Sequence, residues 1–353
     1  MKNKLKKINF KRILDIFSDD IGIDLGTANT MVYARNRGIV LNEPSVVTMN
    51  KKKNTVQAVG TEAKRMIGKT PGNLEAIRPL KDGVIADYEI TEKMLKAFFA
   101  LTTKQNFFIH PRVVICVPAG VTQVEKRAVM DVAREAGARE AYLIEEPMAA
   151  AIGANLNIFE PEGNMIVDIG GGTTEIALIS LGGIVNKSSL RVAGDKINNK
   201  IIQFIKEKHD LTIGEKTAEE IKISIASAID LEEIKTIEVS GRNILTGLPI
   251  NVEINSVEIR ESIRELIEEI IEEIKIILEK SPAELLADIY KKGIVLAGGG
   301  ALIKGLDQRI KNELHIPVSI AENPIYAVVN GIGKLLEDFD HYSEVIISPE
   351  TDY

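Results

Sequence analysis

Two short segments of the chain repeat one pattern of residue types, and that pattern suits the binding of phosphate. Segments 21–30 and 165–174 each run from apolar residues to an aspartate, Asp24 or Asp168, and then into a turn containing glycine and threonine. Glycine in a tight turn exposes backbone N–H groups and lets a ligand approach the main chain closely. An aspartate at the strand end can hold a hydrated Mg²⁺ beside those phosphates. Two such hairpins facing across a cleft would hold a nucleoside triphosphate from both sides.

Either hairpin alone is explained by an ordinary glycine-containing turn, but the matched pair favours a site. The two aspartates lie 144 positions apart, about the length of a domain, which favours a duplicated half. A third glycine run, at 298–300, follows a short apolar strand predicted at 293–297. The polar side chains that add donors to the first two turns are those of Thr27, Asn29, Thr30, Thr173 and Thr174.

These turns need a scaffold that brings them together, and the hydrophobic pattern predicts an α/β one. Segment 112–117 is β-branched and apolar without alternation, as expected of a strand buried on both faces. A helix is predicted to begin after Thr122, because Glu125 completes a capping box. The clearest helix is 258–280, where isoleucine and leucine recur with a 3.6-residue period until Pro282 ends it. Strands that alternate with helices indicate a layered α/β architecture.

Composition narrows the class of protein further. The 353 residues suggest about two domains. One cysteine excludes an internal disulfide framework and a multi-cysteine zinc site, and four scattered histidines argue against a histidine-rich metal centre. The formal net charge of −7 argues against a general nucleic-acid binder, which needs a basic surface. No apolar run approaches the roughly 18 residues of a membrane span.

The N-terminal segment 1–19 departs from this acidic average. Before Asp15 it holds six lysines and arginines and no acid. The apolar residues that share one arc of a predicted helix are Phe10, Ile13, Leu14, Ile16 and Phe17. A basic amphipathic segment of this kind can lie on an anionic membrane. The alternative is a solvated tail whose apolar residues dock on the domain.

Three longer strings resemble the MreB family of bacterial actins, within the actin/Hsp70/sugar-kinase superfamily. They are DLGTANT at 24–30, LNEPSVV at 41–47 and IEEPMAAAIG at 144–153, and the resemblance runs from about residue 20 to about residue 337. It implies an actin-like fold with two duplicated α/β domains, each with an inserted subdomain, and a nucleotide cleft between them. The implied division is 20–36 with 75–150 and 325–345 (subdomain IA), 37–74 (IB), 151–188 with 255–324 (IIA) and 189–254 (IIB).

The resemblance also assigns roles in ATP hydrolysis. Asp24 and Asp168 would contact Mg²⁺ through water. Glu146 would position or polarise the attacking water, and Thr173 would help to orient it. The alternative for Glu146 is a first-turn helix acid favoured by the helix dipole. A carboxylate suits the catalytic role because hydrolysis needs an oriented nucleophile and little covalent help from the protein.

The nucleotide itself would be held by the three turns and one helix. Glu219 and Lys222 match the adenosine-contacting helix of the family, and their spacing puts them on one helical face, where a surface ion pair is the alternative. The complete set of expected nucleotide-binding residues is Gly26, Thr27, Ala28, Asn29, Gly170, Gly171, Gly172, Thr173, Glu219, Lys222, Gly298, Gly299, Gly300 and Ala301. Phe107 and Phe108 resemble a membrane-insertion loop, or else begin a core strand.

Taken together, the resemblance implies a cytoskeletal ATPase that binds and slowly hydrolyses Mg-ATP. It would assemble with itself into double protofilaments at the inner face of the cytoplasmic membrane and determine cell shape or drive shape-based motility. Its expected partners are other copies of the chain, an anionic membrane surface and membrane proteins of the shape machinery. The alternatives are a chaperone-type ATPase, a sugar kinase and a non-catalytic, non-polymerising membrane scaffold.

Overall fold

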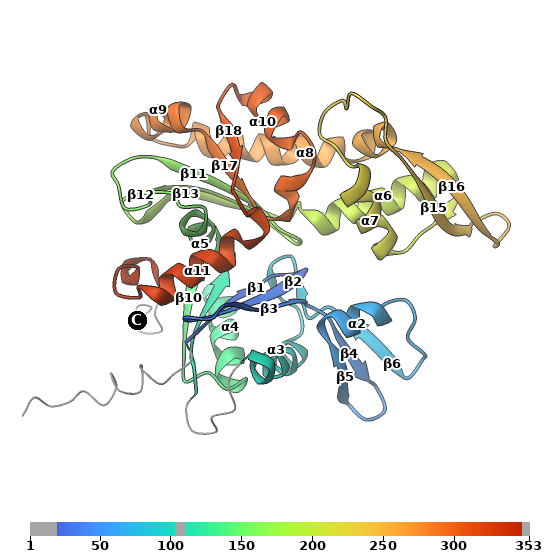
Figure 1. Cartoon of the computed structure of the whole chain (residues 1–353), viewed down its shortest axis with the longest axis horizontal. Helices are drawn as coiled ribbons and strands as arrows, with labels where there is room; N and C mark the ends of the chain where they lie inside the picture. Colours follow the sequence, from blue (N-terminus) through green and yellow to red (C-terminus); the bar gives the residue numbers. More distant parts are fainter. Residues whose placement is uncertain (1–19, 103–109, 348–353) are drawn as a thin grey trace, which may run out of the picture.

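The computed structural model describes residues 20–102 and 110–347, and two five-stranded mixed sheets organise them (Figure 1). The first sheet has the order β10-β9-β1-β2-β3, with β1 at Ile21–Leu25, β2 at Asn29–Ala34, β3 at Gly38–Pro44, β9 at Arg112–Val117 and β10 at Glu140–Glu145. The second has the order β13-β12-β11-β17-β18, with β11 at Asn164–Ile169, β12 at Thr174–Ser180, β13 at Gly183–Leu190, β17 at Ile294–Ala297 and β18 at Val318–Ile320.

The two sheets have the same connectivity. In the first, β1 pairs antiparallel with β2 and β2 with β3, while β1 and β10 each pair parallel with β9. In the second, β11 pairs antiparallel with β12 and β12 with β13, while β11 and β18 each pair parallel with β17. The duplicated α/β architecture expected from the two matched segments is therefore confirmed.

Helices cover the sheets because the central strands are apolar on both faces. Every residue of β11 and β12 is buried, as is every residue of β9 except Arg112, which is typical of strands enclosed between helices. Helices α3 (Tyr88–Thr102) and α4 (Gln123–Glu135) lie together on one face of the first sheet (Figure 1). The predicted capping box is present at α4, where Thr122 and Glu125 each bind the other's backbone N–H.

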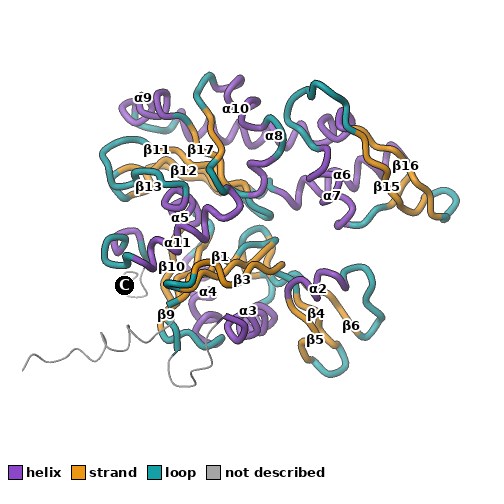
Figure 2. Tube along the Cα trace, viewed as in Figure 1, coloured by secondary structure: helices purple, strands orange, loops and turns teal. Residues whose placement is uncertain are grey.

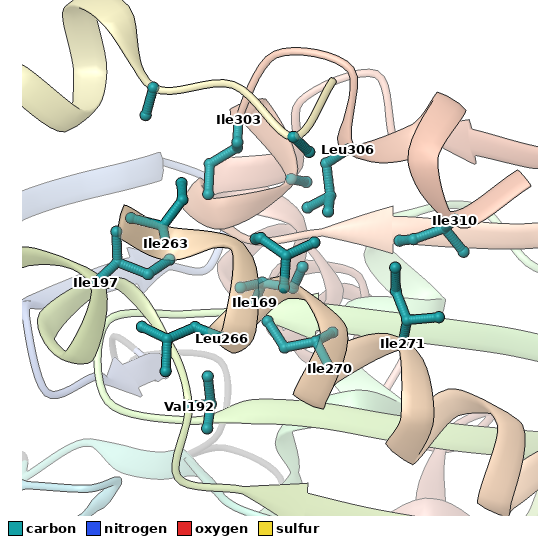
Figure 3. Close-up of a cluster of buried hydrophobic side chains, with 14 of the residues drawn as sticks. Ile169, Val192, Ile197, Ile263, Leu266, Ile270, Ile271, Ile303, Leu306 and Ile310 are labelled. Atoms are coloured by element: carbon teal, nitrogen blue, oxygen red, sulfur yellow. The ribbon is translucent and has the colours of Figure 1, made fainter. Parts of the chain in front are cut away.

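The longest helix, α8 (Ser256–Glu279), carries the core of the second half. It is capped by a second reciprocal pair, Asn255 and Glu258. Its buried isoleucines and leucines meet side chains from the second sheet, from α6 (Gly194–His209) and from α10 (Leu306–Leu314) (Figure 3). Outside its insertion, this half also contains α9 (Ala283–Lys292), the short 3₁₀ turn η1 (Gly299–Leu302) and α10 (Leu306–Leu314).

Each sheet carries an insertion after its third strand, and both insertions extend to the same side of the molecule (Figure 2). The first consists of β4 (Val47–Asn50), β5 (Thr55–Val59), α2 (Gly60–Met66) and β6 (Leu74–Ile77), followed by the short pair β7 (Leu80–Lys81) and β8 (Val84–Ile85). The second consists of α6 (Gly194–His209), β14 (Leu211–Thr212), α7 (Glu215–Ile225), β15 (Thr236–Asn243) and β16 (Pro249–Asn255).

Two helices, α5 (Glu146–Gly153) and α11 (Ala327–Glu337), lie between the sheets and carry the chain from one half to the other (Figure 1). They cross at two glycines: a Cβ added at Gly153 would lie 1.8 Å from the carbonyl oxygen of Ala327, and one added at Gly331 would lie 1.8 Å from that of Ala149. Around them, buried residues of both sheets form one apolar cluster. The connection between the halves is thus densely packed.

Among the residues that the structure describes, no helix has the length and apolar character needed to cross a membrane.

Candidate functional site

The two matched turns meet, one from each half. A Cβ added at Gly171 would lie 2.6 Å from Cβ of Ala28, and one added at Gly172 would lie 2.4 Å from Oγ1 of Thr27. Only glycine allows so close an approach. The Thr27 hydroxyl accepts a hydrogen bond of 2.9 Å from the backbone N–H of Gly83. The predicted pairing of the two hairpins is therefore present in the fold.

The third glycine run lies beside the second turn. Because β17 runs parallel to β11 and places Ala297 opposite Asp168, the segment 298–300 leaves the sheet at the same edge. Gly298 has φ +78°, and a Cβ there would lie 2.3 Å from the carbonyl oxygen of Ile169 and 2.5 Å from Oδ1 of Asp168. Ala301 is buried beneath this turn in η1. All three predicted glycine turns thus converge on the ends of β1 and β11.

A group of carboxylates occupies the point of convergence. Asp168, Glu146 and Glu175 are buried and Asp24 is partly buried. Burial raises the pKa of Asp24 to about 7. Burial, followed by repulsion from Asp24 and Glu175, raises the pKa of Asp168 to about 8. Burial, followed by repulsion from Glu175, Asp24 and Asp168, raises the pKa of Glu146 well above its usual range.

This group has a composition that fits a hydrated divalent cation. No Lys, Arg or His within the described ranges forms an ion pair with any of the four carboxylates. A bound cation would therefore relieve their mutual repulsion. The described residues also contain no cluster of three or more His, Cys, Asp or Glu placed as direct metal ligands. Carboxylates are groups to which Mg²⁺ binds while it keeps several waters and takes further oxygens from phosphates.

Glu146 and Glu145 are adjacent but face different surroundings. Glu146 begins α5, and its side chain is 9% exposed within the carboxylate group. Glu145 is the N-cap, and both of its carboxylate oxygens bind Nζ of Lys187 at 2.7 Å. The structure therefore brings Glu146 to the site and directs Glu145 away from it.

Thr173 lies against the first half, although it belongs to the second. A Cβ added at Gly83, which has φ +78°, would lie 3.1 Å from Cγ2 of Thr173 and 2.7 Å from Cγ of Pro118. The neighbouring carboxylate that the sequence analysis missed is Glu175, which accepts hydrogen bonds from the Ser189 hydroxyl at 2.6 Å and from the backbone N–H of Ala119 at 3.0 Å. The sequence does contain an indication of this residue, because Glu175 is the single charged residue in the apolar strand β12.

Helix α7 of the second insertion borders the second turn. Nζ of Lys222 donates to the carbonyl oxygen of Gly194 at 3.0 Å, and the backbone N–H of Gly194 in turn donates to the carbonyl oxygen of Gly170 at 3.1 Å. Burial lowers the pKa of Lys222. Glu219 forms its ion pair with Lys64 of the first insertion, at 2.8 Å, rather than with Lys222. Both predicted residues therefore lie near the turns, on the helix that faces the opposite half.

Two ion pairs connect the insertions across the space between them. Besides Lys64 and Glu219, Arg78 binds Glu215 with a separation of 2.5 Å between Nη2 and Oε1. The side chains of all four are between 27% and 35% exposed, and together they form a polar rim between the two insertions. The predicted membrane residues Phe10, Ile13, Leu14, Phe17, Phe107 and Phe108 lie outside the described residues.

In chemical terms, the site brings together three glycine turns with closely approaching backbone, four buried or partly buried carboxylates and the Thr173 hydroxyl. A family profile described as MreB/Mbl protein matches residues 18–344. The cell shape-determining protein Mbl of Bacillus subtilis is 50% identical over 325 residues, covering 92% of this chain and 98% of the relative. The cell shape-determining protein MreB of Escherichia coli K12 is 49% identical over 345 residues, covering 96% and 99%.

Two solved structures have a fold similar to that of this chain. MreB5 of Spiroplasma citri bound to AMPPNP superposes with a TM-score of 0.87 at 38% identity, covering 92% of this chain and 97% of that one. A structure described as a MamK double helical filament gives a TM-score of 0.77 at 26% identity, covering 90% and 98%.

Proposed function

Because the chain belongs to the MreB/Mbl family of bacterial actins, we propose that it binds Mg-ATP between its two halves and hydrolyses it slowly. The observation that carries the proposal is the convergence of three glycine turns on carboxylates that have no cationic partner among the described side chains. The relative from Spiroplasma citri has been solved with AMPPNP and with ADP, which supports a nucleotide at this place.

In this proposal, the backbone N–H groups of the two turns bind the phosphates, with the Thr27 hydroxyl beside them. Asp24 and Asp168 would hold Mg²⁺ through its waters, and the cation would supply charge neutralisation to the phosphates. Glu219, Lys222 and the segment 298–301 border the adenosine. The polar rim, which includes Lys64 and Glu219, then lies over the entrance to the nucleotide site.

Glu146 and Thr173 act on the attacking water. Glu146 accepts a hydrogen bond from that water. It takes a proton from the water while the water oxygen forms a bond to the γ-phosphorus. At the same time, the bond between the γ-phosphorus and the β–γ bridging oxygen breaks. Burial, followed by repulsion from the neighbouring carboxylates, raises the pKa of Glu146, which makes its carboxylate a stronger proton acceptor. Thr173 lies on the opposite turn and orients the water from the other half.

Phosphate release by the Glu146→Gln variant tests this assignment. We expect the rate to fall about 10²- to 10⁴-fold, while binding of a fluorescent ATP analogue stays within about threefold because the phosphate turns are unchanged. Glu145→Gln is the matched control, since its carboxylate binds Lys187 outside the site; it should keep the wild-type rate. A Glu146→Gln variant that releases phosphate at full rate would contradict the catalytic assignment.

We also propose that ATP-bound copies assemble head to tail into double protofilaments that serve cell shape or shape-based motility at the inner face of the cytoplasmic membrane. The relatives' names and the filament described for MamK support this. Within the chain we propose the subdomain division given above, in which most of the first insertion falls in IB and most of the second in IIB. The basic N-terminal segment and Phe107–Phe108 are proposed to contact the membrane and its proteins.

Sedimentation separates this proposal from the chaperone-type and scaffold alternatives. We expect the protein to pellet with Mg-ATP and, on vesicles containing anionic lipid, to pellet in larger amount. The Phe107→Ser/Phe108→Ser variant should keep assembly in solution and lose part of its vesicle binding. Absence of assembly at every concentration would favour a chaperone-type ATPase. Nucleotide-independent vesicle binding without assembly would favour a scaffold.

A further inference from the structure

The turn between β4 and β5 carries three consecutive lysines, Lys51, Lys52 and Lys53, in a chain whose formal net charge is −7. All three are exposed. Lys51 forms an ion pair of 3.1 Å with Glu75 of β6, whereas Lys52 and Lys53 have no acidic partner within residues 20–102 and 110–347. Because adjacent like charges repel one another, the turn holds an excess of positive charge that the described part of the fold does not neutralise.

Hydrogen bonds define the backbone of this turn. Oδ1 of Asn50 accepts from the backbone N–H of Lys52 at 3.1 Å and from that of Lys53 at 3.2 Å. Asn54 completes the turn in the left-handed region, with φ +48°, a conformation that asparagine adopts more readily than most residues. The two unpaired lysines therefore extend from a preformed support, and binding through them does not first require ordering of the backbone.

Helix α3 lies beside this turn and adds no charge that would oppose it. Strand β5 contacts α3, and the β4–β5 turn and α3 lie along the same edge of the first half, the lower edge in Figure 1. The two acids of α3 are each paired one turn along the helix, Glu89 with Lys93 at 2.6 Å and Glu92 with Lys96. Since α3 contains no other charged residue, its net charge is zero, and the edge keeps the positive excess of the turn.

The last turn of α3 exposes an apolar side chain on this half. Leu101 is 69% exposed, and α3 leads directly into the segment that contains Phe107 and Phe108, for which membrane contact is proposed above. Exposed apolar side chains combined with lysines are typical of a surface that lies on an anionic membrane, where the apolar groups enter the lipid and the charges stay at the headgroups. This combination favours lipid as the partner of Lys52 and Lys53.

We propose that Lys52 and Lys53 bind the anionic headgroups of a membrane, as an electrostatic contact separate from the apolar one. The inference rests on the proposed function, in which the chain lies on the membrane. Each lysine held near an anionic surface strengthens binding about fivefold, and a contact tethered to another anchor acts at a high effective concentration. The turn also determines which edge of the first half faces the membrane, because two separated contacts resist rotation about either one.

The test is flotation of the full chain, with Mg-ATP, on vesicles of phosphatidylcholine mixed with phosphatidylserine and on vesicles of phosphatidylcholine alone. We expect Lys52→Gln/Lys53→Gln to bind the anionic vesicles at least about fivefold more weakly than wild type. The difference should shrink at high salt, where exposed charges are screened, and should be absent on phosphatidylcholine alone. Equal binding to the anionic vesicles, or an equal loss on both kinds of vesicle, would overturn the proposal.

Two control variants separate this turn from a general effect of charge. Lys280→Gln/Lys291→Gln removes the same charge from two exposed lysines at the ends of α8 and α9 in the second half, which have no acidic partner among the residues that the structure describes. It should bind the anionic vesicles as wild type does. Lys52→Arg/Lys53→Arg keeps the charge of the turn and should also bind normally. An equal loss in the second-half variant, or in the arginine variant, would refute an electrostatic contact at the turn.

Failure of this inference and failure of the proposed function give different results. If the wild-type protein does not float with anionic vesicles, the proposed membrane contact fails, and the inference fails with it. If the wild-type protein floats and depends on Phe107 and Phe108, while Lys52→Gln/Lys53→Gln floats equally well, the inference about the turn fails alone. If that lysine variant instead loses Mg-ATP-dependent pelleting in the absence of vesicles, the turn contacts another copy of the chain, and the proposed lipid contact is overturned.

Discussion

Replacing Gly331 by alanine should destabilise the protein, although alanine is the better helix former. Gly331 lies inside α11, where it crosses α5, and a Cβ there would be 1.8 Å from the carbonyl oxygen of Ala149 and 3.0 Å from the backbone nitrogen of Gly153. Both neighbours are backbone atoms, so no side chain can rotate away. The two helices would have to separate.

The size of the effect follows from two opposing contributions. Helix propensity favours alanine over glycine by about 1 kcal/mol. Relieving the overlap means moving the helices apart by roughly 1.5 Å, to reach ordinary contact, and overpacking of this kind costs about 3 kcal/mol. The net expectation is a loss of about 2 kcal/mol in the free energy of unfolding. For a cooperative unit of 150–250 residues that corresponds to a fall in Tm of about 4–8 °C.

Differential scanning calorimetry of Gly331→Ala beside Asn330→Ala would measure this difference. Asn330 is the preceding residue of α11 and lines a cavity of about 510 Å³, so its replacement adds helix propensity without a clash and should leave Tm equal or slightly higher. If Gly331→Ala were as stable as wild type, or more stable, the close crossing of α5 and α11 would be refuted.

Other predictions concern the rim, the carboxylates and a helix cap. Lys64→Ala should raise the rate of nucleotide release about two- to fivefold in stopped flow, and by less at high salt, because the pair with Glu219 is partly exposed and screened. Asp24 has a pKa of about 7 in the fold against 3.8 ordinarily, so the folded state holds its proton more tightly and stability falls as pH rises from about 4 to about 7. In nucleotide-free protein, Asp24→Asn should therefore raise Tm more at pH 8 than at pH 5. Asn255→Ala should lower the free energy of unfolding by about 1 kcal/mol in urea, because it removes the cap of α8.

Matched controls accompany these predictions. Lys51→Ala breaks an exposed pair with Glu75 inside the first insertion, and it should leave nucleotide release unchanged; an equal acceleration by both variants would exclude a role for the rim. A pH-independent difference between Asp24→Asn and wild type would contradict the raised pKa. Asn251→Ala, on the exposed side of β16, should change stability by less than about 0.5 kcal/mol.

Patterns formed by residues close together in the sequence made much of the fold predictable. Strand, aspartate and glycine turn occur together in one segment of about ten residues, so the matched hairpins could be recognised and their pairing expected. The same holds for the capping box at Thr122 and for the periodic isoleucines of α8. Each of these patterns depends on residues close together in sequence, and each is present in the structure.

Contacts between distant segments were not predictable in this way. The partners of Glu175 come from β9's following loop and from β13, and the partner of Glu219 is Lys64, 155 residues away. For Glu219 the family resemblance implied an adenosine contact, which stays a prediction. The spacing offered only a pair with Lys222, because only neighbours on one helix can be inferred from spacing. Likewise, the need for glycine at 331 arises from a helix that lies far earlier in the chain.

Because α11 packs on the first sheet but is translated late, it determines the order in which the two halves can fold during synthesis. Helix α11 covers the first sheet closely: a Cβ added at Gly22 of β1 would lie 2.3 Å from Cγ2 of Ile332. About 300 residues separate these two segments, so at about 5–20 residues per second the ribosome needs about 15–60 s to make α11 after β1. The second sheet is translated completely within that interval. We therefore expect the second half to fold first on the ribosome, while the nascent first sheet keeps an apolar face that a chaperone must shield until α11 emerges.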